Sequence, residues 1–479
     1  MHKRGKPVGI NVMNEVLANN VIRKFGESLL GALITPNDEG YDMGRRVWNG
    51  LIDRYPAMIA YCSDVDDVIK SVDFALTHGL LTAVRGGGHN VAGNAVCDNG
   101  IVIDLSRMKR IEVNAASLIA RAQAGLTWGE FDRVTQTFGL ATTGGIISRT
   151  GIAGLTLGGG IGWLMRKFGV TCDNLLSAEI ITAGGRLMTA SAVENPDLFW
   201  GLRGGGGNFG IVTEFEYRLH QVGPVLAGTL YYPAAKVRDI LRFYRDFITV
   251  IPDELTTMFV YMAAPMTQSL NRLHLDGPVV AIHVCYVGPL EGGVKVLKPL
   301  RDFGPPLEDT VKIMPYVELQ SMLDSGAPPG LCNFWKSSYL NSFSDEAIDV
   351  FAGYSESITS PLSQVHLQHL KGAVRSVGED DMAFSHRDAL CVLNIVTKWE
   401  NPLEAEKHIQ WTRDFEGAMR PFSSGGVYVN FLGEEGEDRV KAAYGSVKYG
   451  KLIALKNTYD PTNFFRLNQN IKPRGAGSL

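Results

Sequence analysis

The sequence has few cysteines, and they are scattered. Its 479 residues include six, at positions 62, 97, 172, 285, 332 and 391, and no two of them form a CxxC pair. Structural zinc sites and disulfide frameworks use cysteines at short, regular spacings. The scatter therefore predicts no metal site and favours reduced thiols, as in the cytoplasm.

Strong charge and long hydrophobic runs are also missing. The formal net charge is −4, which favours neither a nucleic acid nor an anionic membrane as a partner. The apolar run PVVAIHVCYVG, which begins at Pro278, is far shorter than the roughly 20 residues that span a bilayer. The basic N-terminus is not followed by the apolar segment of a signal peptide. We expect a soluble cytoplasmic protein with a small-molecule partner.

Glycine is abundant and unevenly placed, which divides the chain into two parts. Many of its 54 glycines lie between Gly86 and Gly210, where they separate apolar segments that we predict to be strands. Apolar residues at helical spacing between Ser63 and Leu80 predict a helix between two of these strands. After about Tyr217, stretches such as LTTMFVYM alternate like antiparallel strands. The length of the chain and this change in its sequence pattern together predict two domains.

The first glycine motif is the segment VRGGGHN at residues 84–90, which follows a predicted strand. Three successive glycines expose main-chain N–H groups, and Arg85 adds a positive charge. Such a loop can hold a pyrophosphate. A histidine in such a loop more often makes an ordinary hydrogen bond, but the later glycine clusters weaken that interpretation of His89.

Two further glycine clusters follow. Five of the nine residues at 154–162 are glycine, which is more than turns require and predicts a flat ligand lying against the main chain. The cluster RGGGGNFG at residues 203–210 contains a GxGxxG pattern. We reject a Rossmann nucleotide site there, because the glycines precede the strand-like segment IVTEFEYRL rather than a helix.

The chain resembles the berberine-bridge-enzyme-like branch of the vanillyl-alcohol-oxidase superfamily, to which hydroxynicotine oxidases and many bacterial FAD-linked oxidases are similar. The resemblance extends from about Pro56 to Pro473 and is weakest between residues 220 and 420. It rests on five segments in order: RGGGHN, GLTLGGGIGWLMRKFGVTCDNL, NPDLFWGLRGGGGNFGIVTEF, YVNF and YDPTNFFRLNQNI.

The resemblance implies an α+β, two-domain fold of the vanillyl-alcohol-oxidase type. A discontinuous FAD-binding domain would comprise residues 1–216 and 436–479. A substrate domain, an antiparallel sheet backed by helices, would comprise residues 217–435. The active site would lie at their junction, a frequent place for cofactor sites.

The resemblance also implies a covalent bond between His89 and the C8 methyl group of FAD. A second bond, which many relatives form through a cysteine, is not expected, because Gly151 occupies the matching position. The other residues that match FAD-contacting positions are Arg85, Gly86, Gly87, Gly88, Asn90, Val91, Thr143, Gly144, Gly145, Thr150, Gly151, Gly154, Gly210, Ile211, Val212, Asn468 and Asn470.

Catalytic roles follow less directly from the resemblance. Tyr428 matches an active-site tyrosine and Asn430 shares its motif. Asn394 lies where plant relatives carry a Glu or Gln, and an amide cannot accept a proton at neutral pH. The proton must then pass to Tyr428, to another group, or leave by the substrate's own ionisation. A buried tyrosine with a satisfied hydroxyl is a competing interpretation of Tyr428, and His386 and Arg387 could equally form a structural pair.

The resemblance implies an oxidase that transfers hydride from an alcohol, amine, phenol or sugar to flavin and reduces molecular oxygen to hydrogen peroxide. Gly154 favours this activity, since relatives that exclude oxygen carry a bulkier side chain near there. A dehydrogenase that uses a quinone or protein acceptor, and a non-catalytic flavoprotein, remain alternatives. The sequence leaves the substrate and the oligomeric state open.

Overall fold

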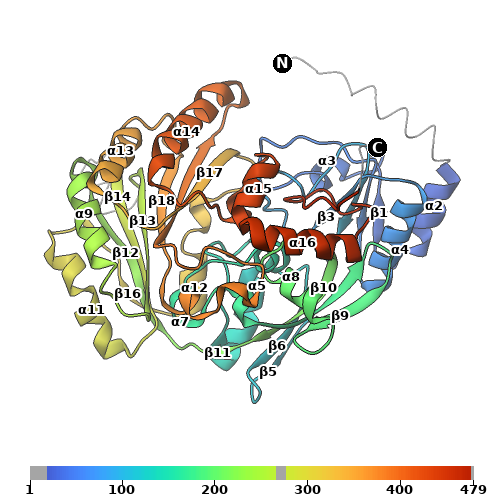
Figure 1. The fold of residues 1–479 in the computed structure, drawn as a ribbon, viewed down its shortest axis with the longest axis horizontal. Coiled ribbons are helices and arrows are strands. Elements are labelled where there is room, and N and C mark those ends of the chain that lie inside the picture. Colours follow the sequence, from blue (N-terminus) through green and yellow to red (C-terminus); the bar gives the residue numbers. More distant parts are fainter. Residues whose placement is uncertain (1–18, 266–276, 476–479) are drawn as a thin grey trace.

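Two bodies packed side by side make up the chain, and each has its own sheets and buried core (Figure 1). The computed structural model describes residues 19–265 and 277–475. The fold combines parallel and antiparallel sheets with helices, so the predicted α+β class is confirmed.

The first sheet of the N-terminal body is mostly parallel, in the order β1-β2-β4-β3. Its strands are β1 (Ala32–Ile34), β2 (Met58–Tyr61), β3 (Thr82–Arg85) and β4 (Ile101–Asp104). Helix α4 (Val65–Thr77) connects β2 to β3 and begins at Asp64, whose side chain accepts the N–H of Asp67. The strand–helix–strand unit predicted from the sequence is confirmed, and it delivers the RGGGHN loop at the end of β3.

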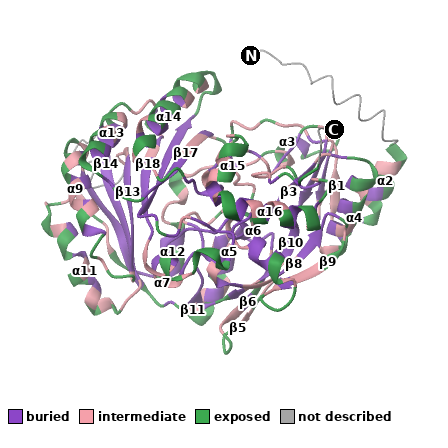
Figure 2. Cartoon of the chain, viewed as in Figure 1, coloured by how far each residue is buried: buried purple, intermediate pink, exposed green. Residues whose placement is uncertain are grey.

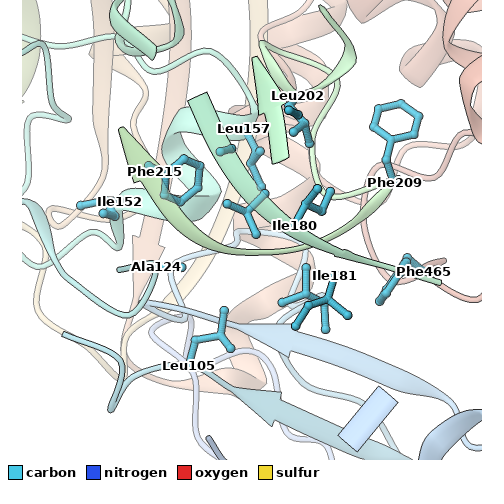
Figure 3. Close-up of a cluster of buried hydrophobic side chains, with 14 of the residues drawn as sticks. Leu105, Ala124, Ile152, Leu157, Ile180, Ile181, Leu202, Phe209, Phe215 and Phe465 are labelled. Carbon is cyan, nitrogen blue, oxygen red and sulfur yellow. The ribbon is translucent and has the colours of Figure 1, made fainter. Parts of the chain in front are cut away.

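The second sheet is antiparallel, in the order β5-β6-β10-β8-β9. Its strands are β5 (Ile111–Asn114), β6 (Ile119–Gln123), β8 (Leu175–Thr182), β9 (Leu187–Ser191) and β10 (Gly210–Arg218). Side chains of both sheets, of α6 (Ile152–Leu157) and of the C-terminal segment meet in one buried cluster (Figure 3). Because β10 follows the GxGxxG pattern directly, the prediction that a strand rather than a helix follows these glycines is confirmed.

A large antiparallel sheet forms the second body, in the order β15-β12-β14-β13-β18-β19-β17, with β16 also paired to β12. Its strands are β12 (Val225–Pro233), β13 (Leu255–Ala263), β14 (Pro278–Tyr286), β15 (Glu308–Asp309), β16 (Lys312–Met314), β17 (Cys332–Leu340), β18 (Gln364–His369) and β19 (Cys391–Trp399). The outer face is covered by α9 (Val237–Phe247), α11 (Leu290–Asp302), α13 (Asp345–Glu356) and α14 (Ala405–Met419). The strands are buried while these helices expose their outer sides (Figure 2). The inner face is turned to the first body.

The chain returns to the first body near its C-terminus. Helices α15 (Glu437–Tyr444) and α16 (Ser446–Tyr459) pack there, and α16 contacts α8 (Pro196–Leu202). The return begins at Val427, which already belongs to the first body's core, somewhat earlier than the expected residue 436. The division into 1–216 with 436–479, and 217–435, stays a proposal about the roles of the two bodies.

All six cysteines are free and buried, with no disulfide among them. Within residues 19–265 and 277–475, no group of three or more His, Cys, Asp or Glu side chains is placed to bind a metal ion. No helix in this part of the chain is both long and apolar enough to cross a membrane.

Candidate active site

A cavity of about 350 Å³ lies between the two bodies. Two loops of the first body form one wall, the RGGGHN loop after β3 and residues 145–151. The inner face of the large sheet forms the other, through β13, β14, β18 and β19. A concave site between two domains is a usual place for a cofactor and a substrate.

Unpaired main-chain N–H groups mark the first wall. The N–H groups of residues 86–91 donate no hydrogen bond to any acceptor in the described part of the chain. Those of residues 143–147 have no described acceptor either. Fixed N–H groups of this kind form a nest that binds anions, so the loops offer the donors that the pyrophosphate of a dinucleotide requires.

His89 lies at the cavity wall, with its ring stacked on Trp48 at 5.3 Å between ring centroids. Burial, and secondly the charge of Arg149, lower the pKa of His89 to about 4. The imidazole is therefore neutral at physiological pH, and its ring nitrogens make no hydrogen bond to a described residue. A neutral imidazole keeps the lone pair that nucleophilic attachment to a cofactor needs.

Most glycines of the 154–162 cluster serve the packing of the protein itself. A Cβ atom on Gly158 would lie 2.0 Å from Oδ1 of Asn430, and one on Gly162 would lie 1.8 Å from the carbonyl oxygen of Gly144. Gly159 and Gly160 have φ values of +113° and +87°, which L side chains rarely adopt. Packing within the protein therefore explains these four glycines, and the prediction that the whole stretch lies against a ligand stays a prediction.

Gly154 differs from them, because a Cβ atom built on it would meet nothing within 4 Å. It lines the cavity on α6. By contrast, Gly87 and Gly151 pack backbone against backbone, since a Cβ on either would lie within 2.4 Å of the other's nitrogen. These two glycines hold the two loops of the first wall together.

Arg85 does not offer a free positive charge to the cavity. Its Nε donates to Oδ2 of Asp104, and both side chains are buried. It therefore lies beneath the loop and neutralises a buried carboxylate. The interpretation of Arg85 as an added charge for a pyrophosphate needs this correction.

The structure brings most of the predicted site residues to the cavity, but not all. Those that line it are Gly86, Gly87, Gly88, His89, Asn90, Val91, Gly145, Thr150, Gly151, Gly154, Asn394, Tyr428 and Asn430. Those that do not are Arg85, Thr143, Gly144, Gly210, Ile211, Val212, Asn468 and Asn470. Neither His386 nor Arg387 lines it; Arg387 forms a buried ion pair with Asp173 at 2.6 Å, which fits the structural interpretation.

Asn468 and Asn470 belong to a tail that is tied to the loop before β10. Nδ2 of Asn468 donates to the carbonyl oxygen of Gly207 at 3.1 Å, and Nδ2 of Asn208 donates to that of Gln469 at 3.2 Å. The side-chain oxygens of Asn468 and Asn470 are buried and have no partner among the described residues. Such orphaned polar atoms are rare and fit a site that a bound group completes.

Tyr428 is fully buried beside the cavity, and its hydroxyl oxygen accepts three hydrogen bonds. The donors are the N–H of Gly160 at 2.9 Å, the N–H of Ile161 at 3.3 Å and Nδ2 of Asn430 at 2.8 Å. Burial raises the pKa of Tyr428, although these donors oppose the rise. The phenol therefore stays protonated at neutral pH, and its proton remains free to donate.

The second wall is polar, and most of it was not predicted. Asn394 of β19 lies directly opposite His366 of β18, and Gln368 is two residues further along β18. Oδ1 of Asn394, Nδ1 of His366 and Nε2 of Gln368 are buried without a partner in the described chain. The alternation in QVHLQH was the only signal in the sequence that could have placed His366 and Gln368 on one face. Trp48, His283 and Lys398 also line the cavity without belonging to a recognisable motif.

Comparisons with known proteins agree with this geometry. Residues 56–191 match the family model described as "FAD binding domain", and residues 427–472 match "Berberine and berberine like". The (R)-6-hydroxynicotine oxidase of Paenarthrobacter nicotinovorans is 32% identical over 466 residues, which cover 94% of this chain and 98% of that protein. An FAD-linked oxidoreductase of Dictyostelium discoideum is 31% identical over 461 residues, 95% of this chain and 98% of that one.

The chain belongs to the berberine-bridge-enzyme-like FAD-linked oxidoreductases. The crystal structure of 6-hydroxy-D-nicotine oxidase from Arthrobacter nicotinovorans superposes with a TM-score of 0.85 at 30% identity, covering 93% of this chain and 99% of that one. Wild-type BBE-like 1 of Physcomitrella patens shares the fold, with a TM-score of 0.83 at 23% identity and coverage of 96% and 100%. The protein is thus an FAD-linked oxidoreductase, and the unpaired N–H groups of its first wall fit that cofactor.

Proposed function

We propose that the protein is an FAD-dependent oxidase in which His89 carries the flavin through a single covalent bond. The observation that carries this proposal is the position of His89. A neutral, unpartnered imidazole lies at the cavity wall, beside a loop of unpaired N–H groups and across from a polar sheet face. A histidine with a purely structural role would be expected to use its ring nitrogens in hydrogen bonds.

The two bodies take different roles in this proposal. Residues 1–216 and 436–479 bind the cofactor, with the N–H groups of residues 86–91 holding its pyrophosphate and Asn468 and Asn470 meeting it from the C-terminal tail. Residues 217–435 bind the substrate against the inner face of the large sheet. The division of the cavity lining between glycine loops and sheet strands supports this assignment.

A bound FAD would supply the hydride acceptor and would pass two electrons on to oxygen; the hydride's hydrogen and a second proton, from the substrate's heteroatom or from solvent, would complete hydrogen peroxide. Tyr428 donates a hydrogen bond to the substrate's heteroatom, and Asn394 and Asn430 orient the reacting groups. Asn394 cannot take a proton. The imidazole of His366, which lies opposite Asn394, has a pKa lowered to about 3 and is a poor proton acceptor, so a substrate that enters ionised is favoured because it needs no base.

Gly154 supports oxygen as the electron acceptor. The open space beside it lies on the wall of the cavity and leaves room for a small molecule. A quinone-linked dehydrogenase is the alternative within the same fold. We expect the enzyme to act in the cytoplasm on a small molecule.

A substrate screen tests this proposal. The purified protein is mixed without air with alcohols, amines, phenols and sugars, and bleaching of the flavin absorbance is followed. Air is then admitted and peroxide is measured. The proposal requires bleaching by at least one compound and peroxide formation on reoxidation. Bleaching followed by electron transfer only to a quinone dye would identify a dehydrogenase, and a flavin that no compound bleaches would point to a non-catalytic flavoprotein.

A further inference from the structure

Lys398 lies near the end of β19, on the wall of the cavity, and only 4% of it is exposed. Its Nζ donates to the carbonyl oxygen of Gly326 at 2.7 Å. No Asp or Glu oxygen in the described part of the chain comes within ion-pair distance of it. A lysine ammonium has three N–H donors, so two of them have no described acceptor.

Each of the other two buried lysines of the described chain is paired with a carboxylate. Nζ of Lys456 bonds to Asp460 at 2.6 Å and to two carbonyl oxygens. Nζ of Lys448 lies 3.0 Å from Glu379 and donates to one carbonyl oxygen. Buried charges cost free energy unless they are paired. Lys398 departs from this pattern, and it does so inside the cavity.

No other side chain of the described cavity lining compensates the charge. The described lining contains no Asp or Glu. Burial, and then the charge of Lys398, lower the pKa of His366 to about 3, and burial lowers that of His283 to about 4, so both imidazoles are neutral. Burial also lowers the pKa of Lys398, but only to about 8, so most of it is charged at pH 7. The sheet wall is therefore positive.

We propose that the substrate carries a carboxylate that pairs with Lys398. This inference rests on the proposed function and names the substrate class of the same site. An acidic group supplies the acceptors that Lys398 lacks, and a charge-assisted hydrogen bond of this kind is among the stronger ones. A substrate whose only charge is an ammonium group would meet Lys398 with no carboxylate to balance it.

The position of Lys398 also indicates where the carboxylate lies in the substrate. Lys398 and Asn394 are four residues apart on the same face of β19, so their backbones are separated by about 13 Å. Asn394 lies at the predicted reacting end of the cavity, and Lys398 at the other. The carboxylate therefore lies at the far end of an elongated molecule, remote from the carbon that is oxidised.

Matched acids and amides test the proposal. The probes are aromatic carboxylic acids of one and two rings, such as 4-hydroxycinnamate, each paired with its primary amide. Binding to the purified holoprotein at pH 7 is measured by calorimetry and by perturbation of the flavin absorbance. Acids are expected to bind at least about tenfold more tightly than their amides, because one charge-assisted bond is lost in the amide. Equal binding of acids and amides, or no binding of any acid, would overturn the proposal.

Two variants test whether the side chain of Lys398 causes the preference for acids over amides. Lys398→Met is expected to remove the preference for acids and to leave the affinity for amides unchanged, and Lys398→Arg is expected to restore part of the preference. The matched control is Lys167→Met, since Lys167 also donates to a carbonyl oxygen, that of Val287 at 2.9 Å, but lies outside the cavity. A preference for acids that survives in Lys398→Met would contradict the role of Lys398. Calorimetry keeps this test separate from the proposed function, because it detects anion binding even in a preparation that is found to carry no flavin.

Discussion

Gly154 lines the cavity at a point where a side chain would enter without displacing protein atoms. Gly154→Val is expected to slow reoxidation of the reduced flavin by oxygen by about tenfold or more, while substrate reduction of the flavin changes little. The physical reason is that the isopropyl group fills the space that oxygen needs. Stopped-flow mixing with air-saturated buffer measures the effect. The control is Gly184→Val, in an exposed turn where a Cβ also meets nothing; equal slowing in both variants would rule out the assigned role of Gly154.

Tyr428 combines a structural and a chemical role at one hydroxyl group. Tyr428→Phe leaves the N–H groups of Gly160 and Ile161 without their acceptor, which is expected to cost about 1–3 kcal/mol in the free energy of unfolding. It also removes the donor to the substrate, so flavin reduction is expected to slow by more than tenfold. Because burial raises the pKa of Tyr428, the wild-type rate of flavin reduction should show no rise between pH 7 and 9 from its ionisation. Urea unfolding and stopped-flow reduction over that pH range check both expectations.

At the scale of the element, glycines that lie close together in the sequence have different roles: some allow the protein to pack, and one lines the cavity. Gly160→Ala is expected to lower the free energy of unfolding by about 1–3 kcal/mol or more, because its φ is +87° and the new Cβ would lie 2.1 Å from Oγ1 of Thr171. Gly154→Ala, in helix α6, is expected to leave stability unchanged or raise it by up to about 1 kcal/mol. Urea denaturation of both variants makes the comparison, and equal losses would contradict the division between packing and cavity glycines.

The elements themselves could be predicted from the sequence, because hydrophobic periodicity fixes them locally. The helix after Ser63, the strand from Gly210 and the alternating strands after Tyr217 all form as their patterns predict. What the glycines contact could not be predicted, since that depends on segments remote in sequence, such as Gly87 against Gly151. The partner of Arg85 was missed for the same reason: Asp104 lies on a neighbouring parallel strand.

The cavity is a property of the whole molecule, because its two walls come from different bodies. The first wall could be predicted from sequence motifs, because binding a dinucleotide restricts the residue types along continuous stretches of the chain. The second wall draws single residues from several strands of the large sheet, including His283, His366 and Lys398, and no short pattern joins them. This is why the cofactor could be inferred from the sequence while the substrate class needed the fold.

Buried neutral histidines predict how the whole molecule responds to acid. The pKa values of His220 and His283 are lowered to about 4, and that of His366 to about 3, in each case chiefly by burial. In the unfolded chain these groups bind protons below about pH 6.5, whereas in the folded protein they stay neutral until about pH 4. The free energy of unfolding should therefore fall as the pH is lowered from 6.5 to 4. Urea unfolding at intervals across that range measures it, and a stability that is constant or rises over that range would contradict the assignment.

The bond between His89 and flavin is the central claim, and mass spectrometry of proteolytic peptides tests it most directly. The acid-precipitated, washed protein should remain yellow, and a single peptide should carry the mass of FAD, the one that contains His89. Because that peptide can also contain Cys97, its fragmentation should place the flavin on His89. No peptide with one of the other five cysteines should carry flavin, and His89→Ala should release its flavin on precipitation. Release of all flavin from the wild-type protein, or a flavin attached to any cysteine, would contradict the account.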